Sequence, residues 1–329
     1  MKFFLILIAV FMPSFSNPMK EEVQRRWNDY KTLYQKSYDD SEEQKRFDIF
    51  ETNLRTIEDH NKQYGDKKVS YKMAVNQFAD LTCDEFAQYY ARGYKPRNTE
   101  STVIPKTKSI YDEVPEEIDW REKGAVTEVK NQGVCGACWA FSTTGSLEGQ
   151  NFLKNGVLVS LSEQELVDCI IARSLRGCNG GFLDVAFQYV IDHGLSTEDD
   201  YPYEEADGTC HRGDLPSAVT EIAYLAIFGT SEEALKDAVG TVGPISVGVD
   251  ATKWQFYSEG VFYDATCKTE ANSLNHAVLV VGYGTEDDGE YWLVKNSYGP
   301  EWGMDGYIKL ARNRNNTCGI ATEPWYPVL

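Results

Sequence analysis

The sequence predicts an α+β protein whose main body has two lobes with a cleft between them. Helical patterns dominate the first part of the chain, and strand-like runs such as PISVGVDA and NHAVLVVGYG follow after about Gly243. A helical half followed by a β-rich half is typical of α+β folds, and a cleft between lobes is a common place for a site. The 329 residues leave room for a separate unit ahead of that body.

The first residues have the features of a secretory signal. Lys2 precedes an apolar run over residues 3–12, and small residues stand at Ser14 and Ser16. The run is too short to span a bilayer, and small residues at these two positions suit cleavage after residue 16. A buried N-terminal strand is the alternative. We favour a signal peptide over residues 1–16, which places the chain in the secretory pathway, where disulfides persist. No later apolar stretch is long enough for a membrane span.

The next unit is mainly helical. A helix capped by Ser41 and ending near Gly65 carries six residues spaced 4, 4, 3, 4 and 4 apart, which fall within roughly 100° of arc. These residues are Glu42, Arg46, Phe50, Asn53, Ile57 and Asn61. The stripe fits an ordinary amphipathic helix, but its mixture of ions, amides and apolar groups favours a helix that holds one partner surface. A second helix over about residues 23–38 repeats the aromatic residues Trp27, Tyr30, Tyr34 and Tyr38.

A linker follows this unit, and the charge of the chain changes there. From about Tyr94 to Pro115 the sequence is rich in Pro, Thr, Ser and Lys, which predicts an exposed connection. Residues 17–112 hold 17 Lys+Arg and 17 Asp+Glu, whereas residues 113–329 hold 14 and 34, a net charge of −20. So acidic a second part argues against nucleic acid or an anionic membrane as a partner.

Seven of the eight cysteines follow the linker. In an oxidising compartment three disulfides would leave one of these seven cysteines unpaired, and a free thiol there calls for a functional explanation. The pair Cys135 and Cys138 in VCGACWAF fits a redox dithiol, half of a zinc site, or a nucleophile beside a structural disulfide. Zinc lacks a second CxxC and the four histidines are scattered, while a redox dithiol lacks a βαβ frame. We therefore favour the nucleophile and predict no metal and no cofactor.

A nucleophilic thiol needs an activating helix end and a base. A helix beginning near residue 137 or 138 would place Cys138 at its positive end, where the thiolate is favoured. Gln132 could aim an amide at a developing oxyanion. His276 starts an apolar strand that turns at TEDDG and returns as EYWLVKNS. With the turn centred near Glu286, His276 and Asn296 become cross-strand neighbours, and the Asn amide oxygen could fix the tautomer of the imidazole.

The sequence motifs around Cys138, His276 and Asn296 are similar to those of a known protein family. The stretch QGVCGACWAFS resembles papain-like cysteine peptidases, and the expected His and Asn follow Cys138 by 138 and 158 residues. NHAVLVVGYG, KNSYGPEWGMDGY, SLSEQELVDC and GCNGG look like other motifs of that family. The helical stripe and AVNQFAD are similar to the inhibitory proregion of the cathepsin L-like branch. The resemblance covers essentially the whole chain after the signal peptide.

The resemblance implies a papain-like fold with a helical lobe and a β-barrel-like lobe. An inhibitory proregion would span residues 17–113, with its linker from about residue 94, and the peptidase domain residues 114–329. Cys138 would be the nucleophile, His276 the base and acid, Asn296 its orienting partner, and Gln132 part of the oxyanion hole. The implied disulfides are Cys135–Cys178, Cys169–Cys210 and Cys267–Cys318, and Cys83 stays unpaired.

The same resemblance implies a cysteine endopeptidase, made as an inactive zymogen, that works through an acyl-enzyme. An extended substrate would pair with Gly180 and Gly181, although this pair could also be a plain turn. The implied P2 pocket consists of Phe182, Leu183, Gly248, Leu274 and Ala277, with Glu323 at its floor. A carboxylate there would accept Arg besides Phe or Leu, unless Glu323 turns to solvent.

The implied partners are protein and peptide substrates, cystatin-type inhibitors and the proregion itself, which would cover the cleft in the reverse direction. Acid is expected to loosen the proregion by protonating carboxylates such as Glu42 and Asp80. The enzyme is expected to be a monomer, either lysosomal or endosomal or outside the cell. Asn315 begins a glycosylation sequon. Tyr298 stands where the family usually has Trp, beside the Asn–His pair.

Two other functions are alternatives to a peptidase. A secreted decoy that only binds peptides would need a broken catalytic set, whereas Gln132, Cys138, His276 and Asn296 are all present. An acyl- or transglutaminyl-transferase would share the Cys–His chemistry. The inhibitory proregion and the CNGG motif argue against a transferase.

Overall fold

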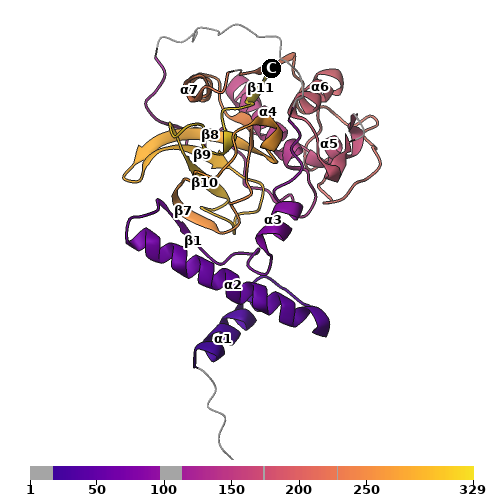
Figure 1. Ribbon diagram of the computed structural model, residues 1–329. Helices are drawn as coiled ribbons and strands as arrows, with labels where there is room; N and C mark the ends of the chain where they lie inside the picture. Colours follow the sequence, from indigo (N-terminus) through magenta and orange to yellow (C-terminus); the bar gives the residue numbers. More distant parts are fainter. Residues whose placement is uncertain (1–17, 97–112, 173–174, 228) are drawn as a thin grey trace, which may run out of the picture.

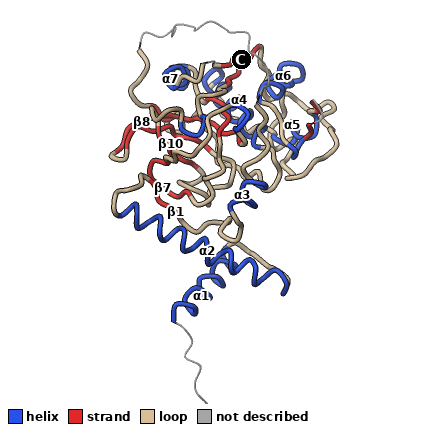
Figure 2. Tube along the Cα trace, viewed as in Figure 1, coloured by secondary structure: helices blue, strands red, loops and turns tan. Residues whose placement is uncertain are grey.

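The computed structural model describes residues 18–96, 113–172, 175–227 and 229–329. The predicted signal peptide and most of the predicted linker lie outside these residues. Figure 1 shows an N-terminal segment (residues 18–96) below a body (residues 113–329). In Figure 2 the strands of the body gather on the left. The α+β fold that the sequence predicts is therefore confirmed.

The N-terminal segment is built on two helices that cross in Figure 1. They are α1 (Pro18–Leu33) and α2 (Asp40–Gly65), followed by the short strand β1 (Tyr71–Met73) and the helix α3 (Cys83–Tyr89). Asp39, and not the predicted Ser41, caps α2, because its carboxylate accepts hydrogen bonds from the amides of Ser41 and Glu42. Thr82 and Glu85 form a capping box at the start of α3.

The polar amides of the predicted stripe on α2 hold the chain from the end of β1 to the start of α3, while its apolar members pack on α1. Asn53 Nδ2 donates to the carbonyls of Ala79 and Leu81 at 2.8 Å each. Asn61 both donates to and accepts from the backbone of Met73, at 2.8 and 2.9 Å. These amide contacts act as backbone hydrogen bonds for a stretch that has little secondary structure of its own.

The apolar members of the stripe build the core of the segment. Phe50 and Ile57 are 1% and 4% exposed and pack with Trp27 and Tyr30 of α1. Phe256 of the body closes the same cluster. The segment therefore folds partly against the body.

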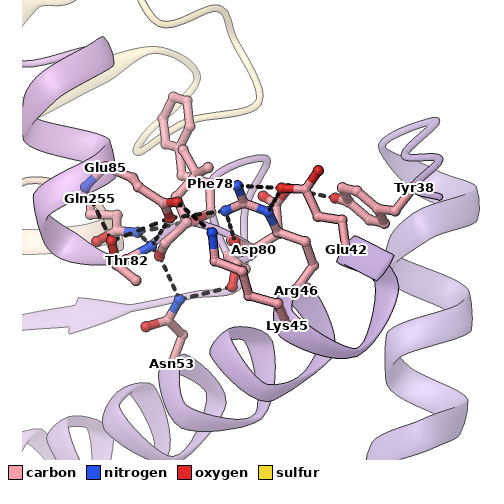
Figure 3. A network of polar contacts seen from close by, with 12 residues as sticks. Tyr38, Glu42, Lys45, Arg46, Asn53, Phe78, Asp80, Thr82, Glu85 and Gln255 are labelled. Carbon is pink, nitrogen blue, oxygen red and sulfur yellow. Dashed lines mark hydrogen bonds and ion pairs between the residues drawn. The ribbon is translucent and has the colours of Figure 1, made fainter. Parts of the chain in front are cut away.

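Figure 3 shows the charged end of the stripe. The guanidinium of Arg46 donates to Glu42 at 2.9 Å, to Glu85 at 2.9 Å and to the carbonyl of Asp80 at 3.0 Å. The Asp80 carboxylate in turn accepts from the hydroxyls of Tyr30 and Tyr38 at 2.5 Å each and lies 3.2 Å from Lys36 Nζ. Both carboxylates named in the acid hypothesis, Glu42 and Asp80, are thus held in ion pairs.

Strand pairing joins the segment to the body. β1 runs antiparallel to β7 (Tyr257–Phe262), with Tyr71 opposite Gly260. A Cβ on Gly260 would lie 2.5 Å from the carbonyl oxygen of Ser70, so only glycine permits this approach. The N-terminal segment is therefore anchored along one edge of the body's sheet.

A side chain of the body holds the segment at a second place. Gln255 Nε2, just before β7, donates to the carbonyls of Phe78 and Leu81 at 3.0 and 2.9 Å. These carbonyls belong to the chain that leads into α3. Beyond α3 the chain then runs from the sheet edge toward the middle of the body (Figure 1).

The helical lobe of the body contains three main helices. They are α4 (Cys138–Asn155), α5 (Glu163–Cys169) and α6 (Leu183–His193), with the short elements β3 (Ile171–Ala172), β4 (Leu175–Arg176) and η1 (Gly177–Asn179). Disulfides join Cys135 to Cys178 and Cys169 to Cys210. The hydroxyl of Ser142 on α4 donates to the carbonyl of Val278 at 2.7 Å, which places this helix against the sheet.

The strands of the second lobe form a nine-stranded sheet together with β1 of the N-terminal segment. Its strand order is β1-β7-β10-β9-β8-β6-β11-β5, and β2 pairs with β8. The remaining bounds are β2 (Ile118–Asp119), β5 (Ala223–Ala226), β6 (Ile245–Val249), β8 (His276–Glu286), β9 (Gly289–Lys295), β10 (Tyr307–Ala311), β11 (Trp325–Val328), α7 (Glu232–Thr241), η2 (Ala271–Ser273) and η3 (Thr317–Gly319). Within the described residues the path of strands is open, so the lobe expected to be barrel-like is a sheet that does not close. A third disulfide joins Cys267 to Cys318.

Buried charges connect the two lobes behind the sheet. Lys295 Nζ on β9 donates to Thr127 at 2.8 Å, and the Thr127 hydroxyl donates to Glu148 of α4 at 2.5 Å. Lys130 Nζ lies 2.8 Å from Glu163 of α5. Because each of these charged groups makes a hydrogen bond or an ion pair, the lobes can meet through a polar contact without leaving a buried charge unsatisfied.

Among the helices that the structure describes, none combines the length and the apolar character that crossing a membrane requires.

The stability of the N-terminal segment should depend on pH through Glu85. Burial raises the pKa of this carboxyl, but hydrogen bonds from Thr82 and Arg46 outweigh burial and hold the pKa below its ordinary value of 4.5. A lowered pKa in the folded state stabilises the fold above pH 4.5, and the contribution is lost as the pH falls through the folded value. Glu85→Gln should therefore cost about 1 kcal/mol at neutral pH and progressively less below pH 4.5.

Amide hydrogen exchange of α2 and α3 in the full chain measures this difference at pH 7, 5, 4 and 3. Asp59→Asn is the matched control, since the Asp59–Lys62 pair is exposed on both sides. A loss of protection by Glu85→Gln that is equal at every pH would contradict the assignment.

Candidate active site

Cys138 is the first residue of α4, and the loop before it is tightly held. The amide of Gly136 donates to the carbonyl of Cys178 at 3.0 Å, beside the Cys135–Cys178 disulfide. A Cβ on Gly136 would lie 2.5 Å from that same carbonyl oxygen, which explains the glycine. Cys138 is fully buried and has a free thiol, and it stands at the positive end of an 18-residue helix.

His276 and Asn296 form one hydrogen-bonded pair. His276 Nε2 lies 2.8 Å from Asn296 Oδ1. An amide oxygen only accepts, so Nε2 carries the hydrogen and donates it. Nδ1 of His276 is buried and has no hydrogen-bond partner in the part of the chain that the structure describes. The imidazole therefore keeps one nitrogen available for proton exchange.

The pairing differs from the predicted hairpin in its register. The turn lies between Glu286 and Gly289, beyond the predicted centre, and Leu279 stands opposite Lys295. A bulge between Val280 and Gly282 shifts the register on one strand. Asn296 follows the last residue of β9, so it reaches His276 diagonally rather than as a directly opposed residue.

Aromatic rings shield this pair from solvent. The ring of Tyr298 stacks on His276 with centroids 4.8 Å apart, and Trp302 meets Tyr298 edge-on at 5.4 Å. Trp254 meets His276 edge-on at 6.2 Å. Tyr298, at the position where Trp was expected, thus keeps an aromatic cover over the His276–Asn296 bond.

Gln132 is fixed next to the same pair. Its Oε1 accepts a hydrogen bond from Ser297 Oγ at 2.6 Å, and its Nε2 donates to the carbonyl of Cys135 at 3.1 Å. The backbone amide of Gln132 donates to the carbonyl of Ser297 at 2.9 Å. The side-chain amide carries a second hydrogen, which these contacts leave for another acceptor.

Burial keeps both reactive groups neutral in this structure. It raises the pKa of the Cys138 thiol to about 12, although the backbone amides of Ala277 and Trp139 face the sulfur and favour the thiolate. It lowers the pKa of His276 to about 4, against the opposing effect of the Asn296 hydrogen bond. At neutral pH the covered site therefore holds a thiol and a neutral imidazole.

The N-terminal segment supplies the cover. The thiol of Cys138 lies 3.4 Å from the carbonyl oxygen of Arg92. The amide of Lys95 donates to the carbonyl of Gly181 at 3.0 Å, and the amide of Gly181 donates to the carbonyl of Gly93 at 2.9 Å. These bonds form a parallel bridge between Tyr94 and Gly181.

Gly180 and Gly181 permit this approach because they lack side chains. A Cβ on Gly180 would lie 2.5 Å from the carbonyl oxygen of Gly93, and one on Gly181 would lie 2.5 Å from the ring of Trp139. An extended chain can therefore come within hydrogen-bond distance of this backbone.

Two of the residues expected to line the P2 pocket, Gly248 and Glu323, lie directly against the side chain of Tyr94. Leu183, Leu274 and Ala277 belong to the same buried cluster as Tyr94, and a Cβ on Gly248 would lie 2.3 Å from the Tyr94 ring. The Tyr94 hydroxyl donates to Glu323 Oε2 at 2.6 Å. Phe182 directly precedes Leu183 at the start of α6.

Sequence reasoning missed Tyr94. It assigned this residue to the start of an exposed linker, whereas Tyr94 is 2% exposed and held in the body. The composition of the surrounding stretch indicated a linker, and a single anchored aromatic residue does not change that composition. The hydroxyl of Tyr298 was missed as well, and it donates to the carbonyl of Tyr90 at 3.0 Å.

Other predicted positions lie outside this cluster. Asn315 is exposed, with a left-handed backbone at φ 60°, while Thr317 of the same sequon is buried. Cys83 is an exposed free thiol on α3. Within the described ranges no group of three or more His, Cys, Asp or Glu side chains could hold a metal ion.

Comparison with known proteins agrees with this arrangement. Residues 114–328 match the family described as papain family cysteine protease, and residues 27–86 match the cathepsin propeptide inhibitor domain (I29). A cathepsin L-like peptidase of Aedes aegypti is 46% identical over 341 residues, covering 100% of both chains. Procathepsin L of Rattus norvegicus is 44% identical over 335 residues, covering 99% of each.

A solved structure is similar over nearly the same length. Digestive procathepsin L 3 of the Tenebrio molitor larval midgut has a TM-score of 0.86 and 44% identity, covering 93% of this chain and 99% of that one. The chain therefore belongs to the papain family of cysteine proteases, as a cathepsin L-like proenzyme in which an inhibitory propeptide precedes the peptidase domain.

Proposed function

We propose that this protease hydrolyses internal peptide bonds through Cys138, His276 and an acyl-enzyme. The observation that carries the proposal is the His276–Asn296 hydrogen bond of 2.8 Å, which leaves Nδ1 without a hydrogen-bond partner among the described residues. The backbone amide of Ala277, next to His276, faces the Cys138 sulfur at the start of α4. Removal of the propeptide would reverse the burial that keeps the thiol neutral. The helix dipole would then favour a thiolate paired with an imidazolium.

The proposed reaction has two halves. The Cys138 thiolate attacks the peptide carbonyl carbon, the C–N bond breaks, and His276 gives its proton to the leaving amine. His276 then takes a proton from water, and the water oxygen attacks the thioester carbon. The C–S bond breaks, the carboxylic acid leaves, and the Cys138 thiolate and the protonated His276 are restored. The second amide hydrogen of Gln132 and the backbone amide of Cys138 would stabilise the oxyanion in both halves.

Substrate would bind in extended form along Gly180 and Gly181, with its P2 side chain in the pocket that Tyr94 fills in the proenzyme. The apolar walls support a preference for aromatic or aliphatic P2 residues. Glu323 would also accept Arg by charge pairing. The hydrogen bond from Tyr94 supports a Glu323 that faces this pocket.

The proenzyme would consist of a signal peptide (1–16), a proregion (17–113) and a mature domain (114–329). The parallel bridge between Tyr94 and Gly181 supports a propeptide that crosses the cleft in the direction opposite to a substrate. Acid would loosen it by protonating carboxylates of the network in Figure 3.

Further partners would be protein and peptide substrates and cystatin-type inhibitors, and the enzyme would act as a monomer. The three disulfides support a secretory route that ends in lysosomes or outside the cell. The exposed position of Asn315 supports glycosylation there.

The peptidase activity is tested with fluorogenic Phe-Arg and Arg-Arg dipeptides and acid-activated protein. Both should be cleaved, and Cys138→Ala should lower kcat/KM by at least about 10³-fold, because it removes the nucleophile. Cys83→Ser removes the other free thiol and should leave activity unchanged. Cleavage of Phe-Arg alone would remove the proposed acceptance of Arg, and cleavage of neither would favour the peptide-binding decoy.

The Tyr298 hydroxyl should strengthen inhibition by the propeptide, because it donates to the carbonyl of Tyr90. Tyr298→Phe keeps the ring over His276 and should weaken inhibition of the mature enzyme by residues 17–113, raising Ki by about fivefold. Tyr263→Phe is the control, since this side chain is 39% exposed. An unchanged Ki would show that the hydroxyl contributes nothing to binding.

A further inference from the structure

We infer that the P2 pocket recognises a phenolic hydroxyl, so that the mature enzyme prefers Tyr to Phe at P2. The inference rests on the proposed function, in which Glu323 faces this pocket. Beyond that function, Glu323 would prefer a P2 side chain that offers a neutral hydrogen-bond donor.

The propeptide residue Tyr94 occupies the pocket as a substrate side chain would. The carbonyl of Gly93 and the amide of Lys95, on either side of Tyr94, take both backbone hydrogen bonds of Gly181. Tyr94 is therefore the residue centred on the glycine that would align a substrate. Its side chain enters the pocket from that backbone position.

The ring fits the walls closely. A Cβ on Gly248 would lie 2.3 Å from Tyr94 Cε1, so the absence of a side chain at Gly248 makes the space for the ring. Leu183, Leu274 and Ala277 are all at most 3% exposed and pack in the same cluster. These contacts account for an aromatic ring but do not distinguish Tyr from Phe.

The floor makes that distinction. The Tyr94 hydroxyl donates to Glu323 Oε2 at 2.6 Å, a short hydrogen bond of the charge-assisted kind. Phe fills the same walls without offering a donor, and a site arranged to bond a hydroxyl discriminates against the analogue that lacks it. A P2 Arg can reach the Glu323 carboxylate as well, but its flexible side chain fills the space taken by the Tyr94 ring less completely.

The test compares Tyr-Arg, Phe-Arg and 4-methylphenylalanine-Arg fluorogenic dipeptides, using enzyme obtained by activating the full chain. The methyl group matches the hydroxyl in size but donates no hydrogen bond. We expect kcat/KM for Tyr to exceed that for Phe by about tenfold and that for the methyl analogue by at least as much.

The Glu323 variants identify the source of the preference. Glu323→Gln keeps a neutral acceptor and should reduce the Tyr/Phe ratio to about threefold, and Glu323→Ala should bring it close to one. Each ratio is taken within one enzyme, so changes in the amount of active protein cancel.

A Tyr/Phe ratio near one in the wild type, or one that Glu323→Ala leaves unchanged, would overturn the inference while Phe-Arg cleavage upholds the peptidase. If no substrate were cleaved, the proposed function itself would fail, and the preference with it.

Discussion

The contact between the Cys138 thiol and the backbone of Arg92 is the constraint on which the proenzyme depends. It removes the sulfur from water, and this burial raises the pKa of the Cys138 thiol. The segment around Arg92 therefore affects both the access to the Cys138 thiol and its protonation. A segment that merely blocked access would leave the thiol in water, whereas this one also buries the sulfur and so favours its neutral form. The pKa of His276 is lowered by burial under rings of the body itself, those of Tyr298 and Trp254.

Holding that contact requires the whole N-terminal segment. The α2 stripe fixes the chain between β1 and α3 through side-chain amides and Arg46, and this chain places α3. Strand β1 joins the edge of the body's sheet, and Phe256 completes the aromatic core. The residues from Arg92 to Lys95 thus enter the cleft from a folded base, which lowers the conformational entropy lost when they bind.

The groups of the peptidase domain around Cys138 and His276 are also held in place. The Cys135–Cys178 disulfide and Gly136 hold the loop before α4. Hydrogen bonds link Asn296, Ser297 and Gln132 at the end of β9. Hydrogen bonds from Lys295 to the Thr127 hydroxyl and from that hydroxyl to Glu148 connect that strand to α4. The proposed nucleophile and its base come from different lobes, so this interface sets their relation.

The sequence alone determined the class of fold and the order of the two units, because local motifs and helical periodicity carry that information. It singled out Cys138 as the candidate nucleophile, which stays a prediction. It also indicated that one face of α2 holds a partner, since the stripe mixes group types at helical spacing. It did not determine the cap at Asp39 or the hairpin register, which depend on hydrogen-bond geometry and a bulge. Only the tertiary structure decided the place of Tyr94. This residue lies against Gly248 and Glu323 and shares a buried cluster with Leu183, Leu274 and Ala277, and these positions come from four distant parts of the chain that become neighbours only after folding.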